Sequence, residues 1–328
     1  MLLQHLGAEV TGFALPTPTS PAMFDMIAGT NCCNHILGDI RDAEILTNAV
    51  AQHEPDIVLH LAAQPLVRAS YADPVPNFAT NVMGTVHILD ACRQVPSVKA
   101  IVIITTDKCY HNDNRTTGYT EDDKLGGFDP YSNSKACAEL VTASYRDSFF
   151  AARKVGVASA RAGNVIGGGD YAEDRLVPDA IRAFIEGNTV AVRNPSAVRP
   201  WQHVLEPLYG YLLLAQSLYV DQSFAAGWNF GPAASDMAKV EVVVSKLAHQ
   251  WGAAKGMAVQ LGSHPHEAAM LTLDSSHAAK KLFWTPKLNL DQTLEMTVDW
   301  YRAALNRSDL ADITRQQIIS YLAGVSHA

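Results

Sequence analysis

The chain has 328 residues, a formal net charge of −8 at pH 7 and hydrophobic residues at 48% of its positions. This composition is typical of a globular protein, and the length suffices for one large core or two smaller ones. The negative charge argues against nonspecific nucleic-acid binding through a basic surface. We therefore predict no nucleic-acid partner, although a local cluster of arginines could still bind an anionic ligand.

The cysteines and the apolar runs favour a cytoplasmic protein. Five cysteines occur, an odd number without paired metal-ligand spacing, and we interpret them as reduced thiols. No apolar run approaches the length of a membrane span, and the first residues lack the features of a signal peptide. His264, His266 and Glu267 superficially suggest a metal site. Pro265 and the loop setting argue against it, so we predict no metal and no membrane partner.

The first half of the chain alternates short apolar runs with amphipathic segments. Residues 2–7 have the pattern of a helix end and residues 9–15 that of a strand, so the chain opens inside a helix and we expect the element before it to be missing. The further strands are predicted at residues 56–63, 100–104 and 155–161, with helices over 43–52, 74–95 and 131–149. This alternation predicts an α/β fold with a doubly wound parallel sheet.

The pattern changes after Asn164, where a glycine run at residues 167–169 begins the second half. Helices are predicted over residues 176–187, 207–218, 240–251 and 290–305, and extended segments over 198–204 and 228–230. We expect a smaller C-terminal α/β part that covers the sheet and holds a substrate. The predicted division is 1–163, 164–306 and a helical tail at 307–328 that carries no chemical signal.

The stretch from residue 105 to residue 135 carries the clearest chemical signal. It follows a β-branched run at residues 100–104, which is typical of a buried parallel strand, and open α/β sheets bind their ligands just past such strands. Tyr131 and Lys135 are four residues apart and so share one face of a helix. A nearby lysine favours the phenolate that a tyrosine base requires. The alternative is a chance pair on a solvated helix.

Several motifs resemble those of a known family. Tyr131 and Lys135 after Thr106 and Asp107, with residues 161–165 downstream, resemble the extended short-chain dehydrogenases/reductases. Longer strings resemble the CDP-glucose 4,6-dehydratases in particular, and the match runs from about Gly7 to Arg302. These strings are residues 60–68, 80–86, 106–110, 129–135, 161–169 and 199–205. The resemblance implies a Rossmann-like fold, with residues 1–163 as the NAD-binding domain and 164–306 as the nucleotide-sugar-binding part.

The same resemblance implies NAD as the cofactor. Its expected contacts are Asp39 and Ile40 near the adenine, Leu61, Ala62, Ala63 and Gln64 along the ribose and pyrophosphate edge, Asn81 and Thr105 in the cleft, and Tyr131 and Lys135 at the nicotinamide ribose. For Asp39 the alternative is a helix N-cap. The glycine-rich turn that should bind the pyrophosphate does not occur after a first strand. We therefore expect that the first strand and this loop are missing and that the chain is truncated at its N-terminus.

The implied reaction has three steps: oxidation at C4 of the sugar, loss of water across C5 and C6, and return of the hydride to C6. Tyr131 with Lys135 would take the proton of the 4-hydroxyl, which Thr106 would hydrogen-bond. Asp107 and Lys108 are the natural acid–base pair for the elimination. Related dTDP-glucose dehydratases carry Glu in place of Lys108, which favours a CDP-sugar. The alternatives are a β-branched strand residue at Thr106 and a surface lysine at Lys108.

The diphosphate of the substrate requires hydrogen-bond donors. Asn164, Arg193 and Arg199 are the candidates, since arginine matches phosphate oxygens; Arg193 could equally be a solvated arginine. The helical segments 77–91 and 134–149 resemble a dimer-forming pair, so we expect a homodimer, although these helices could simply cover the sheet.

Two other functions stay open at this point. One is a different nucleotide-sugar epimerase, decarboxylase or dehydratase. The other is an inactive, truncated protein that only binds a nucleotide sugar, because the pyrophosphate loop is absent.

Overall fold

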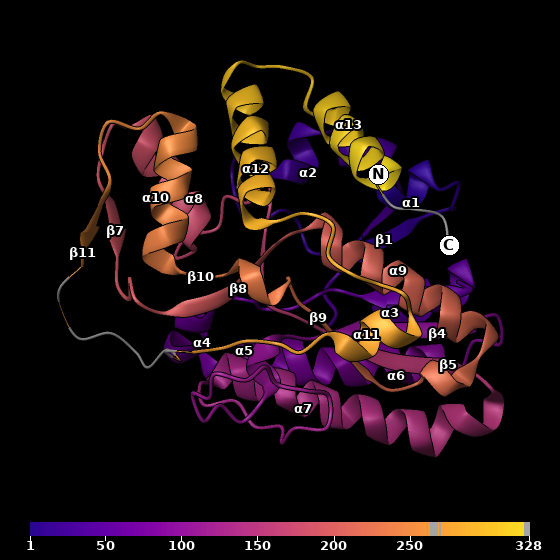
Figure 1. The fold of residues 1–328 in the computed structure, drawn as a ribbon. Helices are drawn as coiled ribbons and strands as arrows, with labels where there is room; N and C mark the ends of the chain where they lie inside the picture. Colours follow the sequence, from indigo (N-terminus) through magenta and orange to yellow (C-terminus); the bar gives the residue numbers. More distant parts are fainter. Residues whose placement is uncertain (261, 263–267, 269, 325–328) are drawn as a thin grey trace.

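A four-stranded parallel sheet lies at the centre of the computed structural model, which describes residues 1–260, 262, 268 and 270–324 (Figure 1). Its strands run in the order β3-β4-β5-β9, and every neighbouring pair is parallel. Their bounds are Ile57–His60, Ala100–Ile104, Gly156–Ala162 and Gly227–Phe230. The predicted parallel α/β fold is confirmed.

The register of this sheet brings two candidate segments to one edge. Ile104 at the end of β4 pairs with Ala160 near the end of β5, so both strands leave the sheet at the same edge. Thr106 follows β4 and Asn164 follows β5. Ligands of open α/β sheets bind at this carboxyl edge, so the fold places both residues where a site is expected.

A second, two-stranded parallel sheet pairs β1 (Thr11–Ala14) with β2 (Asn34–Leu37). In the described part of the chain, β1 has no strand partner besides β2, and β3 has none besides β4. In the doubly wound strand order 3-2-1-4-5-6, the first strand lies between the second and the fourth. The described strands therefore form two separate parallel sheets in place of one continuous sheet of that order.

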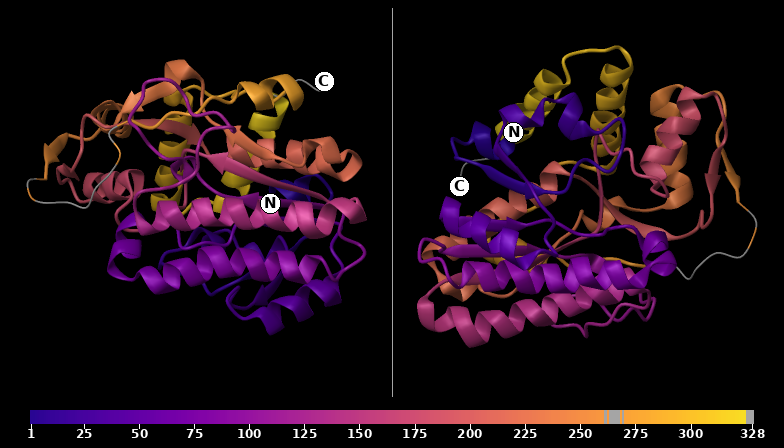
Figure 2. Two further views of the ribbon diagram at one scale, coloured as in Figure 1. Left: turned by 90° about the horizontal axis from the view of Figure 1, so that it is seen from below. Right: turned by 180° about the vertical axis from the view of Figure 1, so that it is seen from behind.

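Helices cover both faces of the main sheet. Helices α3, α6 and α7 stack on one face, and α9 packs against β4 and β5 on the other. Figure 2 shows α6 and α7 running side by side. The bounds on this part are α1 Leu2–His5, α2 Met23–Met26, α3 Ala43–His53, α4 Val67–Ala72, α5 Pro74–Phe78, α6 Gly84–Cys92, α7 Pro130–Tyr145 and α9 Leu205–Val220.

The single helix predicted over residues 74–95 is divided in the structure. A π-helical turn, Ala79–Met83, separates α5 from α6. Within this turn the Asn81 side chain hydrogen-bonds the backbone of Gln64 through both its oxygen (2.8 Å) and its nitrogen (3.0 Å). Such π-bulges frequently occur at functional sites, and this one ties the end of β3 to the helical layer.

The second half forms small sheets and a helical group. Strand β8 (Val198–His203) pairs with β6 (Asn164–Ile166) and β10 (Met237–Lys239), and β7 (Val190–Val192) pairs with β11 (Met257–Val259). Its helices are α8 Leu176–Ile185, α10 Val240–Trp251, α11 Ser276–Lys281, α12 Leu290–Leu305 and α13 Leu310–Ala323. The apolar faces of α8, α10 and α12 meet in one core around Ile181, Val244 and Val298, whereas α11 packs in the core of the main sheet. Because α9 and β9 return to the main sheet, the parts predicted to meet at residue 163 share that sheet.

Three properties of the described residues concern membrane-spanning helices, metal-binding groups and cysteines. No helix among them is both long enough and apolar enough to cross a membrane. They also contain no group of three or more His, Cys, Asp or Glu side chains that could hold a metal ion. The metal candidates His264, His266 and Glu267 lie outside the described residues. All five cysteines are free thiols.

Candidate active site

Three side chains fix the backbone at the start of α7, where Tyr131 lies. The Asp129 side chain caps the helix by accepting from the backbone N–H of Ser132 at 2.9 Å, and Pro130 occupies the first turn. The hydroxyl of Ser70 accepts from the backbone N–H of Tyr131 at 3.1 Å, and Asn77 donates to the Pro130 carbonyl at 3.0 Å. Helices α4 and α5 therefore position the tyrosine through its backbone.

A short 3-10 turn, Asp107–Cys109, follows β4 and gathers three predicted residues. The Thr106 hydroxyl donates to Asp107 Oδ1 at 2.9 Å, and Lys108 Nζ lies 3.6 Å from the same oxygen. Asp107 is fully buried, and its Oδ2 accepts no hydrogen bond within the described chain. Buried polar atoms are normally paired, so this orphaned carboxylate oxygen suits a ligand hydroxyl.

The Tyr131–Lys135 pair has its expected helical spacing but not a direct contact. Lys135 Nζ donates to the carbonyl of Ile104 at 3.0 Å, at the end of β4. Burial lowers the pKa of Lys135 to about 8, opposed by the negative charge of Glu139. Burial raises the pKa of Tyr131 to about 12, although a hydrogen bond with Thr106 offsets part of this rise. A tyrosine in this state needs additional positive charge nearby before it can act as a base.

Beneath this pair lies a buried polar network centred on Glu139, one turn after Lys135. Glu139 accepts from the hydroxyls of Thr105 and Ser159 and from Arg161 Nη2 at 2.8 Å. Burial alone would raise the pKa of Glu139, but Arg161 and these hydrogen bonds outweigh it and lower the pKa. The Thr105 side chain therefore faces this network, and Thr105 is 6% exposed.

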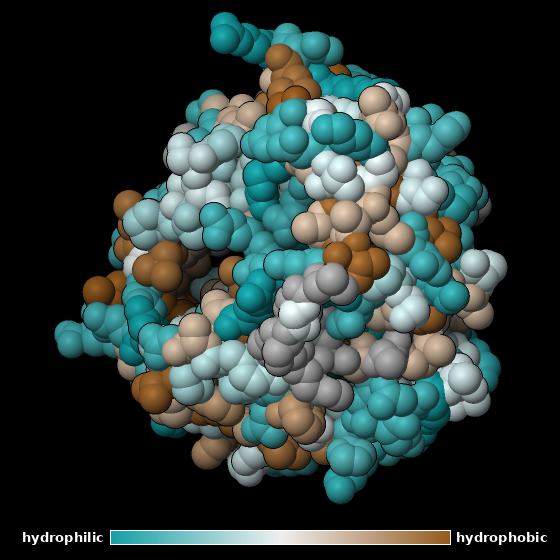
Figure 3. All heavy atoms as spheres, turned by 90° about the vertical axis from the view of Figure 1, so that its left-hand side faces the viewer, coloured by the Kyte–Doolittle hydropathy of each residue, from teal (hydrophilic) through white to brown (hydrophobic). Residues whose placement is uncertain are grey.

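A cavity of about 810 Å³ opens beside these residues, between the sheet edge and the second half of the chain. Of the residues predicted for catalysis, Thr106, Lys108 and Tyr131 line it. Its volume is typical of a site for a ligand as large as a nucleotide sugar. Figure 3 views the molecule from the side that carries β7 and β11 and shows a hollow in this face.

The residues predicted for substrate binding also reach the cavity. Asn164, Arg193 and Arg199 line it. Asn164 has a buried Oδ1 without a hydrogen-bond partner in the described chain, which suits a ligand. Arg199 donates to the carbonyls of Val198 and Ala268, so its guanidinium also supports the wall. Arg193 Nη1 donates to the Asp174 carboxylate at 3.1 Å.

The residues predicted for NAD extend along the sheet edge from this cavity. Leu61 is 51% exposed at the end of β3, and Ala62, Ala63 and Gln64 continue from it. Asn81 holds the Gln64 backbone and also donates to the Ser134 hydroxyl on α7 at 2.9 Å. Asn81 therefore positions both this edge and the helix of Tyr131.

Asp39 and Ile40 follow β2, a strand of the separate two-stranded sheet. The Asp39 carboxylate pairs with Arg41 at 2.5 Å, and Asp42, not Asp39, caps the helix that follows. The N-cap alternative for Asp39 is therefore wrong. The Ile40 side chain packs in the core against Gly84, and its carbonyl lies 2.9 Å from His87 Nδ1.

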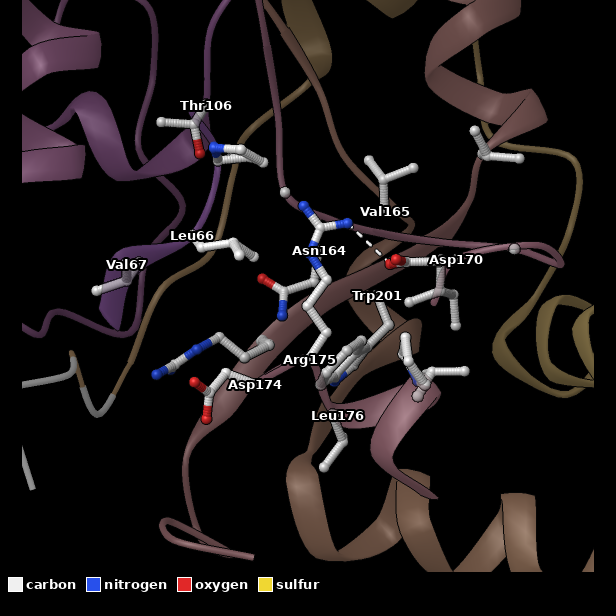
Figure 4. A pocket seen from close by; sticks show the side chains of 18 of the residues that line it. Leu66, Val67, Thr106, Asn164, Val165, Asp170, Asp174, Arg175, Leu176 and Trp201 are labelled. Atoms are coloured by element: carbon white, nitrogen blue, oxygen red, sulfur yellow. Dashed lines mark hydrogen bonds and ion pairs between the residues drawn. The ribbon is translucent and has the colours of Figure 1, made fainter. Parts of the chain in front are cut away.

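The sequence reasoning missed a set of charged residues in the cavity wall. Figure 4 shows Arg175 reaching into the pocket, where its Nη1 donates to Asp170 at 2.8 Å. Arg68, on α4, donates to Asp174 at 2.8 Å from the opposite side. The available signal was the run from Asp170 to Arg175, which has four charged residues in six positions directly before α8.

Comparison with known proteins identifies the family. The family model described as GDP-mannose 4,6 dehydratase matches residues 26–297, most of the chain. The chain belongs to this 4,6-dehydratase family. It is also 47% identical to the CDP-glucose 4,6-dehydratase of Salmonella typhimurium over 330 residues, which cover 99% of this chain and 92% of that protein. A dTDP-glucose 4,6-dehydratase of Xanthomonas campestris is 24% identical over 81% of the chain.

Solved structures agree with this 4,6-dehydratase in fold. A UDP-glucose 4-epimerase from Thermotoga maritima superposes with a TM-score of 0.80 at 22% identity, covering 92% of this chain and 94% of the other. A dTDP-glucose 4,6-dehydratase double mutant from Streptomyces venezuelae, with NAD bound, also has a TM-score of 0.80 at 22% identity, with 94% and 95% covered. The predicted Rossmann-like fold is thereby confirmed.

Proposed function

We propose that this 4,6-dehydratase converts CDP-glucose into CDP-4-keto-6-deoxyglucose with NAD as its cofactor. The observation that carries the proposal is the convergence of Thr106, Lys108 and Tyr131 on one wall of the cavity, beside the buried Asp107. The 47% identity to a CDP-glucose 4,6-dehydratase supports the choice of nucleotide. A solved relative in complex with NAD supports the cofactor.

The residues along the sheet edge fit NAD on its nicotinamide side. Lys135, one turn after Tyr131 on α7, would lie with it at the nicotinamide ribose. Residues 61–64 would follow the ribose and pyrophosphate, with the half-exposed Leu61 at their start and Gln64 held by Asn81. Asp39 and Ile40 would lie near the adenine. Bound NAD would supply reversible hydride storage, taking a hydride from C4 and giving it to C6 of the same sugar.

Tyr131 would accept the proton of the sugar 4-hydroxyl. Burial raises the pKa of Tyr131 to about 12, so the residue needs added positive charge to reach the phenolate. Lys135, one turn away, and a bound NAD would supply it. Thr106, which interacts with Tyr131, would orient the 4-hydroxyl toward the tyrosine oxygen.

Asp107 and Lys108 would carry the elimination. The ketone at C4 acidifies the proton at C5, and Lys108, which lines the cavity, would remove it. Asp107 would give a proton to the departing 6-hydroxyl through its unpaired Oδ2, so that water leaves. Asn164 and Arg199 are the proposed ligands of the diphosphate, and Arg175, in the middle of the cavity, adds a third donor.

The direct test is product formation. Incubation with CDP-glucose and NAD should yield a 4-keto-6-deoxy sugar nucleotide, detected by mass spectrometry as a loss of one water. In the Asp107→Asn variant we expect dehydration to fall by 10²-fold or more, whereas oxidation at C4 persists. An unchanged product profile in this variant would favour an epimerase, for which Asp107 has no proton to give.

The remaining alternative is a protein that binds a nucleotide sugar without turnover. Quantifying the NAD bound to the purified chain separates the two functions, because stoichiometric NAD is incompatible with a cofactor-free binding protein.

We further propose a cytoplasmic homodimer that pairs α6 and α7 with the same helices of a second copy. The exposed Leu140 of α7, and the exposed Met83 and Phe149 in the turns that adjoin these helices, support the dimer.

A further inference from the structure

A second group of charged side chains lies in the cavity away from Tyr131. Arg68 comes from α4, Arg193 follows β7, and Asp174 lies in the loop before α8, and all three line the cavity. Nη1 of Arg68 and Nη1 of Arg193 donate to the same atom, Oδ1 of Asp174, at 2.8 and 3.1 Å. The two arginines hold the carboxylate from both sides and fix its orientation.

The other oxygen of this carboxylate is available to a ligand. Asp174 Oδ2 accepts no hydrogen bond from the residues that the structure describes, and the side chain is 41% exposed. Burial would raise the pKa of Asp174, but hydrogen bonds and charges of Arg68 and Arg193 outweigh it and lower the pKa. The group therefore stays ionised near neutral pH and can only accept hydrogen bonds.

The geometry of the cavity indicates which part of the substrate reaches Asp174, provided that the proposed function holds. The sugar must lie beside Thr106 and Tyr131, where its 4-hydroxyl reacts. Figure 4 shows Thr106 and Asp174 on opposite sides of the pocket, with Asn164 between them. A nucleotide sugar has its diphosphate between sugar and nucleoside, so a diphosphate at Asn164 leaves the base at Asp174 and Arg193.

We propose that Asp174 and Arg193 recognise the cytosine base, with Asp174 Oδ2 accepting from the N4 amino group and the Arg193 guanidinium donating to N3 and O2. Cytosine presents this amino group beside two acceptors. Uracil and thymine present a carbonyl at position 4 and an N–H at position 3, so the contacts at these two positions are reversed, whereas the contact with O2 is the same for all three bases. A carboxylate facing the O4 carbonyl brings two acceptors together, and a guanidinium facing the N3–H brings two donors together, so both arrangements are repulsive.

The test compares the binding of CDP, UDP, dTDP and GDP by isothermal titration calorimetry at one salt concentration. The wild-type protein should bind CDP more tightly than UDP and dTDP by roughly 5- to 150-fold, the range for a paired polar contact to a base. In Asp174→Asn this preference should fall to within about 3-fold, because the amide can donate to O4 as readily as it accepts from N4.

The substitution is suited to the position. Asp174 has a left-handed backbone with φ of 61°, which asparagine also adopts readily, so the variant should fold. Asp170→Asn is the matched control, since it removes a carboxylate that pairs with Arg175 in the same cavity. It should change the affinities for all four nucleotides alike and leave the CDP-to-UDP ratio intact. Arg193→Gln is a second variant that should also reduce that ratio.

Three outcomes would overturn the proposal: equal wild-type affinities for CDP and UDP, an unchanged ratio in Asp174→Asn, or tighter binding of GDP than of CDP. The last outcome would assign the carboxylate to the amino group of guanine. This result can be told apart from a failure of the proposed function. If the protein does not turn over CDP-glucose, the affinities for CDP and UDP can still be measured and compared. Conversely, dehydration of CDP-glucose with an unchanged ratio in Asp174→Asn would reject only the role of Asp174.

Discussion

At the scale of single residues, the site depends on buried polar groups whose partners come from distant parts of the chain. Glu139 connects Thr105, Ser159 and Arg161, three residues on or beside neighbouring strands. The buried ion pair of Glu139 and Arg161 is costly to break, so Glu139 stays charged and in place. Its negative charge raises the pKa of the neighbouring Lys135 against the effect of burial. Lys135 itself is spaced for Tyr131 but donates to the end of β4.

Two buried histidines should make the protein less stable in acid. Burial lowers the pKa of His60 to about 3, with a smaller effect from Lys135, and lowers the pKa of His203 to about 4. In the unfolded chain a histidine has a pKa of about 6.5. Below that pH the unfolded state binds protons that the folded state does not, so stability is full above pH 6.5 and falls as the pH drops.

Each histidine should therefore remove about 2 kcal/mol from the free energy of unfolding between pH 7 and pH 5. Urea unfolding of the wild type and of His203→Phe at both pH values isolates the second contribution. The variant should lose about 2 kcal/mol less than the wild type over this interval. Identical losses would show that His203 titrates normally in the folded protein.

At the scale of elements, the helix α7 carries two of the proposed catalytic residues, Tyr131 and Lys135. Its N-terminus is fixed by the Asp129 cap, by Ser70 and by Asn77, and Tyr131 lies in its first turn. The tail helix α13, in which the sequence showed no chemical signal, also contributes to the site. Thr314, Gln317 and Ile318 on α13 line the cavity, and Tyr321 donates to the buried Glu206 of α9 at 2.8 Å.

Removal of the α7 cap should affect catalysis more than stability. Asp129→Ala should lower the free energy of unfolding by about 1 kcal/mol, the usual effect of a lost N-cap. It should also lower kcat by about 10-fold, because a frayed first turn misplaces Tyr131. Asp42→Ala is the control, since Asp42 caps α3 through Glu44 and Ile45 far from the cavity. It should show the same loss of stability with an unchanged kcat.

Urea unfolding and steady-state turnover of both variants provide the comparison. Equal kcat values for Asp129→Ala and Asp42→Ala would mean that the first turn of α7 keeps its place without its cap. In that case Ser70 and Asn77 alone position the tyrosine.

At the scale of the whole molecule, the covered and uncovered faces of the sheet differ. The α9 face is enclosed by the second half of the chain, whereas α6 and α7 present their outer sides to solvent (Figure 2). Leu140 on α7 is 60% exposed, and Met83 and Phe149, in the π-helical turns that adjoin α6 and α7, are exposed as well. Large exposed apolar side chains along two neighbouring helices favour an interaction surface.

The proposed dimer should therefore dissociate when this face is charged. Light scattering should give the wild type twice the mass of one chain, and Leu140→Lys should shift it toward one chain by raising the dissociation constant at least about 10-fold. Val220→Lys, which charges the exposed end of α9, is the control and should stay dimeric. A wild-type protein with the mass of a single chain would refute the dimer.

Much of the fold followed from local patterns. The helices over residues 240–251 and 290–305 and the strand at 100–104 were predicted with the bounds that the structure has. Long amphipathic and β-branched runs are determined by side-chain periodicity, which the sequence displays directly. Strand β2, helix α4 and the π-turn within residues 74–95 were missed, because short elements and bulges depend on contacts with distant residues such as those of Asn81.

The sequence by itself determined the spacing of Tyr131 and Lys135, the Thr106–Lys108 turn after a buried strand and the family resemblance, because each is a property of neighbouring residues. Only the tertiary structure decided what faces the ligand. It placed Thr106, Lys108 and Tyr131 with Asn164 around one cavity, turned Thr105 toward Glu139 and brought Arg68 to Asp174 across 106 residues of chain. Such pairings arise from the register of parallel strands and the packing of helices on them, which no local pattern encodes.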